Sequence, residues 1–179
     1  MSTRADGNGV GHGRDPGGAP EPAVDLAGAE RAVSDLLRAL GVDQSDANLR
    51  ETPRRVAQTY KDLVSPRPFN LTSFPNDEAY DELVVAKDIP FHSLCAHHLL
   101  PFHGLAHVGY LPGKRLLGLS KLARVVDMFA RGLQLPANLS SLCASWLQAC
   151  WEPRGVGVVV EAEHLCMPRW GVRSQGART

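Results

Sequence analysis

The sequence has no excess of charge of either sign, because 19 Lys and Arg residues balance 19 Asp and Glu residues. A neutral chain has no overall field that would recruit nucleic acid or an anionic membrane surface. No apolar run approaches the roughly 20 residues of a membrane-spanning helix, and the N-terminus lacks the apolar core of a signal peptide. Four cysteines without an export signal indicate a reducing compartment, where thiols are core residues or metal ligands. These absences predict a cytoplasmic protein that binds neither nucleic acid nor membrane.

Residues 1–22 have almost no large apolar side chain and are rich in Gly, Pro and Asp. Such a segment cannot bury enough surface to offset its ordering entropy, so we expect a disordered tail there. Residues 23–179 are long enough for one hydrophobic core. We therefore expect a single domain whose N-terminal part, residues 23–66, is helical.

Apolar residues recur at spacings of three and four in four segments, which predicts four amphipathic helices. The predicted helices cover residues 25–40, Thr52 to before Pro66, Ser120–Leu133 and Leu139–Trp151. Thr52 and Ser120 are the predicted N-caps, because a side-chain hydroxyl can accept a bond from an N–H of the first turn. Cys143 and Cys150 lie on the apolar stripe of the last helix, so their predicted role is core packing.

Three segments favour β-strands: residues 81–93, 105–111 and 155–167. Residues 95–104 and the proline-rich residues 66–76 are expected to be loops. In the last strand, alternation places one set of side chains on a common face. This set is Val156, Val158, Val160, Ala162, His164 and Cys166.

A thiol and an imidazole, Cys95 and His98, stand three residues apart after the first predicted strand, with His97 between them. Such a pair can place S and N on one tetrahedral ion, because zinc takes both ligand types at about 2.0–2.3 Å. A buried free cysteine beside a surface histidine is the alternative that the pair alone leaves open. His164 and Cys166 are the candidates for a further ligand.

These motifs, taken in order, resemble those of the GTP cyclohydrolase I family. The matching stretches are Cys95-Ala96-His97-His98 with Pro101-Phe102, Gly118–Arg124 and Glu163–Met167. The resemblance implies an α+β tunnelling fold, in which an antiparallel sheet carries paired helices on one face and several subunits form a barrel. It also implies a homo-oligomer, a pentamer or a decamer of two pentameric rings, with active sites between subunits.

By the same resemblance, Zn²⁺ binds Cys95, His98 and Cys166 and keeps one open position, which is the catalytic pattern. The ion would lower the pKa of bound water and deliver hydroxide to C8 of a purine nucleotide. Ring opening would release formate, and the ribose carbons would then close a dihydroneopterin-type pterin, as in pterin and tetrahydrofolate biosynthesis. His164 matches the family's general acid/base, and His97 matches the histidine that contacts the purine imidazole.

The triphosphate and ribose are assigned by resemblance to Ser120, Lys121 and Arg124, whose hydroxyl and cationic groups suit anionic oxygens. Without the resemblance, these residues would indicate an ordinary solvated helix face. Trp170 occupies the place of a phosphate-binding arginine, for which the adjacent Arg169 could substitute.

Further departures from the family pattern concern the substrate rather than the metal. Ala96 replaces a glutamate, and Ala137 stands where the family's glutamate grips the guanine N1 and 2-amino hydrogens. Losing two charged hydrogen bonds of about 1.5–3 kcal/mol each would weaken guanine recognition by roughly two to four orders of magnitude. The sequence also stops at Thr179, where family members go on into another β-strand.

Three functions fit these residues. The first is a zinc-dependent cyclohydrolase acting on GTP or a related purine nucleotide. The second is a non-catalytic paralogue that binds a nucleotide or pterin, or that joins an active homologue in mixed rings. The third is a remnant in which zinc only holds the fold. Because the metal ligands are kept while the guanine clamp is missing, the first function is our prediction.

Overall fold

The computed structural model describes residues 23–67, 69–70 and 72–164. The elements, in order, are α1 (Leu26–Ala39), α2 (Thr52–Val64), β1 (Ser73–Pro75), β2 (Val84–Cys95), β3 (Pro101–Leu111), β4 (Arg115–Leu117), α3 (Leu119–Ala130), β5 (Leu133–Gln134), α4 (Pro136–Trp151) and β6 (Gly155–His164). Each helix within the described ranges is too short or too polar to cross a membrane.

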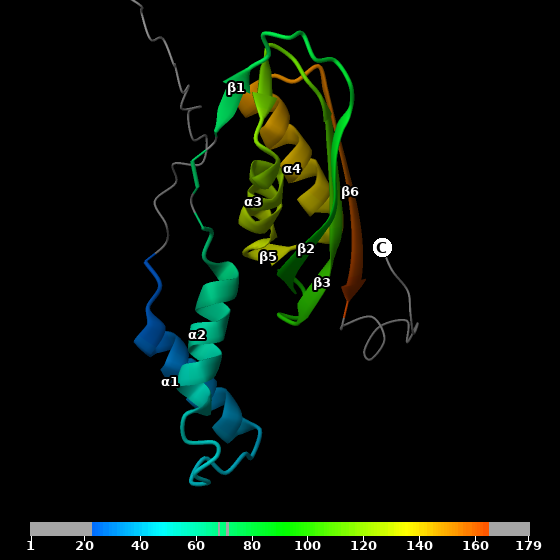
Figure 1. The fold of residues 1–179 in the computed structure, drawn as a ribbon. Coiled ribbons are helices and arrows are strands. Elements are labelled where there is room, and N and C mark those ends of the chain that lie inside the picture. Colours follow the sequence, from blue (N-terminus) through cyan, green and yellow to red (C-terminus); the bar gives the residue numbers. More distant parts are fainter. Residues whose placement is uncertain (1–22, 68, 71, 165–179) are drawn as a thin grey trace, which may run out of the picture.

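The main sheet has the strand order β5-β2-β3-β6. β3 pairs antiparallel with both β2 and β6, and the short β5 runs parallel to the end of β2. Helices α3 and α4 cover one face of this sheet, whereas α1 and α2 form a separate pair beside its β5 end (Figure 1). The predicted α+β class, with an antiparallel sheet and paired helices on one face, is confirmed. This arrangement agrees with the tunnelling fold that the resemblance implies.

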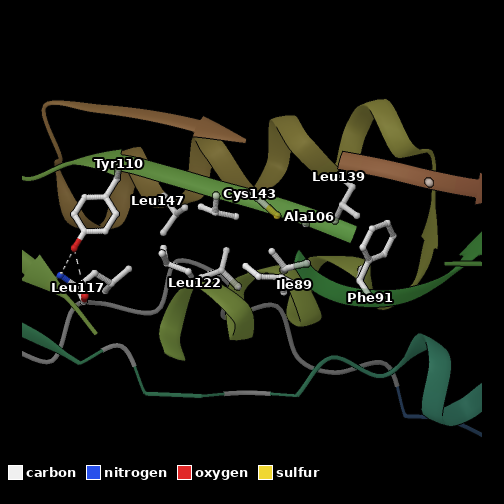
Figure 2. Close-up of a cluster of buried hydrophobic side chains, with 14 of the residues drawn as sticks. Ile89, Phe91, Ala106, Tyr110, Leu117, Leu122, Leu139, Cys143 and Leu147 are labelled. Carbon is white, nitrogen blue, oxygen red and sulfur yellow. Dashed lines mark hydrogen bonds between the residues drawn. The ribbon is translucent and has the colours of Figure 1, made fainter. Parts of the chain in front are cut away.

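The hydrophobic core fills the space between the sheet and the helices α3 and α4. Figure 2 shows Tyr110 of β3 in one cluster with Leu122 of α3 and with Cys143 and Leu147 of α4. The Tyr110 hydroxyl accepts from the Leu117 N–H at 3.2 Å and donates to the Leu117 carbonyl at 3.4 Å. The one polar atom of this side chain is therefore satisfied within the core.

The strands β3 and β6 approach closely at Gly104. A Cβ there would lie 1.9 Å from the Glu161 carbonyl oxygen, a backbone atom that cannot rotate away. Gly104→Ala is therefore expected to lower the free energy of unfolding, measured in urea, by about 2 kcal/mol. Gly157→Ala is the matched control, because a Cβ there meets nothing within 4 Å. Equal stability of the two variants would contradict the observed pairing of β3 with β6.

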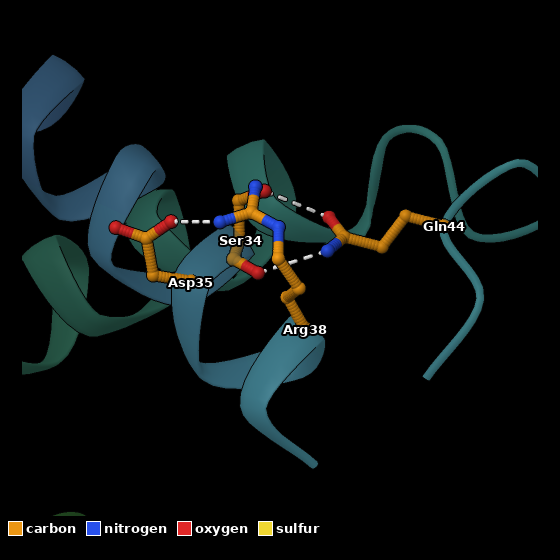
Figure 3. Close-up of polar contacts among 4 residues, drawn as sticks. All are labelled: Ser34, Asp35, Arg38 and Gln44. Atoms are coloured by element: carbon orange, nitrogen blue, oxygen red, sulfur yellow. Dashed lines mark hydrogen bonds and ion pairs between the residues drawn. The ribbon is translucent and has the colours of Figure 1, made fainter. Parts of the chain in front are cut away.

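The end of α1 is fixed to the segment that follows it by Gln44. The Ser34 hydroxyl donates to Gln44 Oε1 and Gln44 Nε2 donates to the Ser34 carbonyl, both at 2.8 Å (Figure 3). The Arg38–Asp35 ion pair lies one turn further along the same helix. Leu36 and Leu40 remain 58% and 68% exposed, so α1 keeps apolar side chains on its outer surface.

Two predicted N-caps are wrong. Glu51 precedes α2 and Gly118 precedes α3, and neither helix has a side-chain cap bond. Thr52 and Ser120 instead lie inside the first turn. Thr52 is the first residue of α2 and Ser120 is the second residue of α3, so neither hydroxyl occupies the flanking position from which a side chain caps the first N–H groups.

Two predicted loops contain strands. Residues 73–75 form β1, which pairs with β4 some forty positions later, a partner that no local pattern could reveal. Half of residues 95–104 belong to β2 or β3, and residues 96–100 connect the two strands. Leu133, predicted as helical, lies in β5 because the chain leaves α3 through Gly132 with a φ of +113°.

Candidate metal and nucleotide site

The turn between β2 and β3 holds Cys95 and His98 near each other. The Cys95 N–H donates to the Leu100 carbonyl at 2.8 Å, and the Cys95 carbonyl accepts from the Leu99 N–H at 2.9 Å. Leu99 has a φ of 55°, which costs a residue with a side chain roughly 1–2 kcal/mol. Such a conformation persists only where the surroundings constrain it.

Two neighbouring elements supply that constraint. The Ala96 N–H donates to the Gln134 carbonyl of β5 at 3.2 Å. The Tyr60 hydroxyl of α2 donates to the Leu99 carbonyl at 2.9 Å. The turn is therefore held from the sheet side by β5 and from the outside by α2.

The distance between the two candidate ligand atoms fits one ion. Cys95 Sγ lies 3.8 Å from His98 Nδ1. A tetrahedral zinc with bonds of about 2.3 Å to sulfur and 2.0–2.1 Å to nitrogen separates these atoms by about 3.6 Å. Cys95 is 4% exposed, whereas His98 is exposed. An ion held by this pair would thus have the core on one side and solvent on the other.

The third predicted ligand, Cys166, lies outside the described residues. Among those that are described, no three metal-binding side chains converge. The backbone of His164 ends β6 opposite Phe102, which in turn pairs with Ser93 of β2. Two strand spacings of about 4.8 Å place His164 roughly 10 Å from Ser93. The end of β6 and the Cys95 turn therefore lie at the same end of the sheet.

Tyr60→Phe tests whether α2 positions this turn. Removing one hydrogen bond costs about 0.5–1.5 kcal/mol, so we expect zinc affinity to fall about three- to tenfold. Competition with a chromophoric chelator measures this change. Tyr80→Phe is the control, since the Tyr80 hydroxyl bonds Glu82 at 3.2 Å on an exposed segment. If both variants bind zinc as the parent protein does, α2 does not position the turn.

The candidate phosphate-binding residues Ser120, Lys121 and Arg124 all lie in the first half of α3. Ser120 and Arg124 are exposed, and Lys121 is half-buried. The 12 residues of α3 rise about 18 Å, and β5, which contacts the Cys95 turn, follows the far end of the helix (Figure 1). One chain therefore holds the two groups of candidate residues toward opposite ends of α3. Arg169 lies outside the described residues.

Comparison with known proteins identifies the family. The family model described as GTP cyclohydrolase I matches residues 29–179. The chain belongs to the GTP cyclohydrolase I family. The resemblance that its motifs predicted is thereby confirmed.

Several curated relatives carry the name GTP cyclohydrolase 1. The protein from Mycolicibacterium gilvum (strain PYR-GCK) is 48% identical over 163 residues, which cover 88% of this chain and 81% of the relative. The protein from Brucella anthropi is 48% identical over 158 residues, or 86% and 74% of the two chains. A solved structure of the archaeosine synthase QueF-Like covers 46% of this chain and 82% of that one at 22% identity. Its TM-score of 0.43 is too low to support an inference about function.

Ala137, the position of the expected guanine-binding glutamate, follows β5 in the sequence by three residues. It occupies the first turn of α4 and is exposed. Gln134, three positions earlier, accepts from the Ala96 N–H at 3.2 Å. The Ser140 and Ser141 hydroxyls donate to the Ala137 carbonyl at 3.2 and 3.3 Å, but the Ala137 methyl group itself can bind no base edge.

Cys143 and three further histidines contact other parts of the sheet or the core rather than the Cys95 turn. Burial raises the pKa of Cys143 to about 12, so its thiol stays protonated at neutral pH and the predicted core role is confirmed. His107 accepts from the Asp88 N–H at Nδ1 (3.2 Å), and its Nε2 lies 3.6 Å from a Glu161 carboxylate oxygen. The exposed rings of His92 and His103 stack with centroids 6.1 Å apart.

The sequence did not predict a hollow that lies beside the candidate phosphate-binding residue Arg124. A hollow of about 230 Å³ is lined by Arg67, Phe69, Arg124 and Asp127. Two of these residues come from the segment after α2, which was predicted only as a proline-rich loop. An arginine between two prolines, followed by an aromatic residue, was the available signal.

Proposed function

We propose that this protein is a zinc-dependent hydrolase that opens the imidazole ring of GTP or a related purine nucleotide, releasing formate and forming a dihydroneopterin-type product. The observation that carries the proposal is the 3.8 Å separation of Cys95 Sγ and His98 Nδ1 at the edge of the core. The relatives named GTP cyclohydrolase 1 support the same reaction. The cytoplasm is its proposed location.

Cys95, His98 and Cys166 are the proposed zinc ligands. Zinc bound there would lower the pKa of a water molecule and so supply hydroxide at neutral pH. His164 is the proposed proton donor and acceptor at the opening ring, and His97 would contact the purine imidazole. Ser120, Lys121 and Arg124 would hold the ribose and triphosphate through charge-assisted hydrogen bonds. Arg169 is a further candidate for the phosphates.

We assign each active site to a junction between two subunits. Cys95 and His98 lie toward one end of α3, and the candidate phosphate-binding residues lie toward the other. A site shared by two neighbouring copies would bring the two groups together. Apolar side chains on the sheet face away from α3 and α4 also support assembly. Val85, Leu105 and Val159 are 42%, 39% and 60% exposed there, and a neighbouring copy would cover them. The proposed assembly is a homo-oligomer, a pentamer or a decamer.

Formate release tests the proposed reaction. The zinc-loaded protein is incubated with GTP, ITP and ATP, and formate is measured together with the absorbance of a pterin product. We expect formate and a pterin from at least one nucleotide, and neither from the protein stripped by a chelator. Formate from none of the nucleotides would contradict the proposal.

Ala137 favours a second candidate, a non-catalytic paralogue that binds a nucleotide or pterin or joins an active homologue. Without a carboxylate at this position, the base loses its charged acceptor. Nucleotide binding without formate release would support this function. Recovery of mixed rings with an active homologue, unaffected by His164→Ala, would support it further.

A further inference from the structure

The hollow of about 230 Å³ beside α3 presents two arginines, Arg67 and Arg124, from separate segments. The chain between α2 and β1 passes α3 on its way to β1 (Figure 1). Both arginines are exposed, and the structure gives neither guanidinium a hydrogen bond or ion pair to another described residue. Their donors are therefore available to a ligand.

Phe69 fixes the segment that carries Arg67. Its ring lies 6.1 Å from the ring of Trp146 on α4, and Trp146 lies 6.2 Å from Phe129 of α3. Both Phe69 and Trp146 pack against the main core. Prolines at 66 and 68 in the sequence further restrict the backbone of Arg67. Folding therefore already restricts the conformation of the segment that carries Arg67, so binding of a ligand costs less conformational entropy.

The carboxylate in the hollow is already neutralised. Asp127 accepts two bonds from Arg131, from Nε to Oδ2 and from Nη2 to Oδ1, both at 3.2 Å. Arg131 is held in place because its side chain is only 13% exposed and its Nη1 donates to the Asp62 carbonyl. With Asp127 paired in this way, Arg67 and Arg124 leave the hollow with an excess of positive charge. Planar guanidinium groups match phosphate oxygens in charge and geometry.

We propose that Arg67 is a further phosphate-binding residue of the nucleotide site, acting together with Arg124. The inference rests on the proposed function, because it takes Arg124 as a contact of the substrate triphosphate. Arg67 would bind oxygens of the polyphosphate chain from the side opposite α3. Phe69 would close the hollow with an apolar wall that limits access of water to these bonds.

Binding of inorganic tripolyphosphate to the zinc-loaded protein, measured by calorimetry, tests the proposal without requiring turnover. Arg67→Ala is expected to weaken this binding about ten- to hundredfold, because each lost bond is to a charged group. Arg67→Lys should recover part of the affinity, since the charge is kept but the fork of donors is lost. Arg38→Ala, which removes an exposed arginine of α1, is the matched control and should bind as the parent protein does.

Three results would overturn the proposal. They are unchanged binding by Arg67→Ala, an equal loss in Arg38→Ala, and a loss confined to orthophosphate while tripolyphosphate and GTP bind as before. Arg67→Gln keeps a polar side chain without the positive charge and replaces Arg67→Ala if that variant melts at a lower temperature. Weakened tripolyphosphate binding in a protein that releases no formate from any nucleotide would support Arg67 and contradict only the proposed reaction.

Discussion

Cys95→Ser should abolish stoichiometric zinc binding and lower formate release more than a hundredfold, a larger loss than the 10–100-fold typical of residues that only support a ligand. A serine hydroxyl is not deprotonated at neutral pH, whereas a thiolate is a strong zinc ligand. Sγ of Cys95 is also the atom that lies 3.8 Å from His98 Nδ1. Elemental analysis and the formate assay measure the two effects on the same preparation.

Cys150→Ser is the matched control for this substitution. Cys150 lies on α4, is partly buried and packs against the core, so its replacement tests the loss of a sulfur without touching the turn. We expect this variant to keep about one zinc ion per chain. If Cys95→Ser also retained its zinc and its activity, the metal would have to be held by other residues.

Ala137→Glu is expected to raise kcat/KM for GTP by roughly two to four orders of magnitude, because it supplies two bonds from a charged acceptor to N1 and the 2-amino group. Ala137 is exposed in the first turn of α4. The positive end of the helix favours a carboxylate there. A glutamate side chain would therefore fit at this position, and its negative charge would interact favourably with the N-terminus of α4.

The comparison of GTP with ITP isolates the guanine contact, since ITP lacks the 2-amino group. Ala137→Glu should increase the preference for GTP over ITP about tenfold or more. Ala137→Gln, with the same length and no charge, should give a smaller increase. An unchanged preference in both variants would mean that the base does not lie near the start of α4.

Local patterns predicted helices and strands that have one apolar face. The spacing of apolar residues identified α1, α2 and α4, and alternation placed Val158 and Ala162 of β6 toward the core. The pairing of β1 with β4 escaped detection because its partners are far apart in the sequence. The N-cap of α3 was misplaced because Gly118, with no side chain to signal a cap, takes that position.

The candidate site was predicted only in part for the same reason. Cys95 and His98 are close in the sequence, so their spacing was enough to suggest a shared ion. Two contacts depend on the tertiary fold instead: the bond from the Tyr60 hydroxyl to the Leu99 carbonyl, and the position of Arg67 beside Arg124. No pattern of neighbouring residues encodes them.

X-ray absorption at the zinc edge tests the proposed coordination most directly. A single metal site made of two thiolates, one imidazole and one exchangeable solvent oxygen predicts two sulfur scatterers at about 2.3 Å and lighter atoms at about 2.0–2.1 Å. Cys95→Ser should remove one of the two sulfurs from any zinc that remains. A spectrum without sulfur, or one with four protein ligands and no oxygen, would contradict the hydrolytic role of this turn.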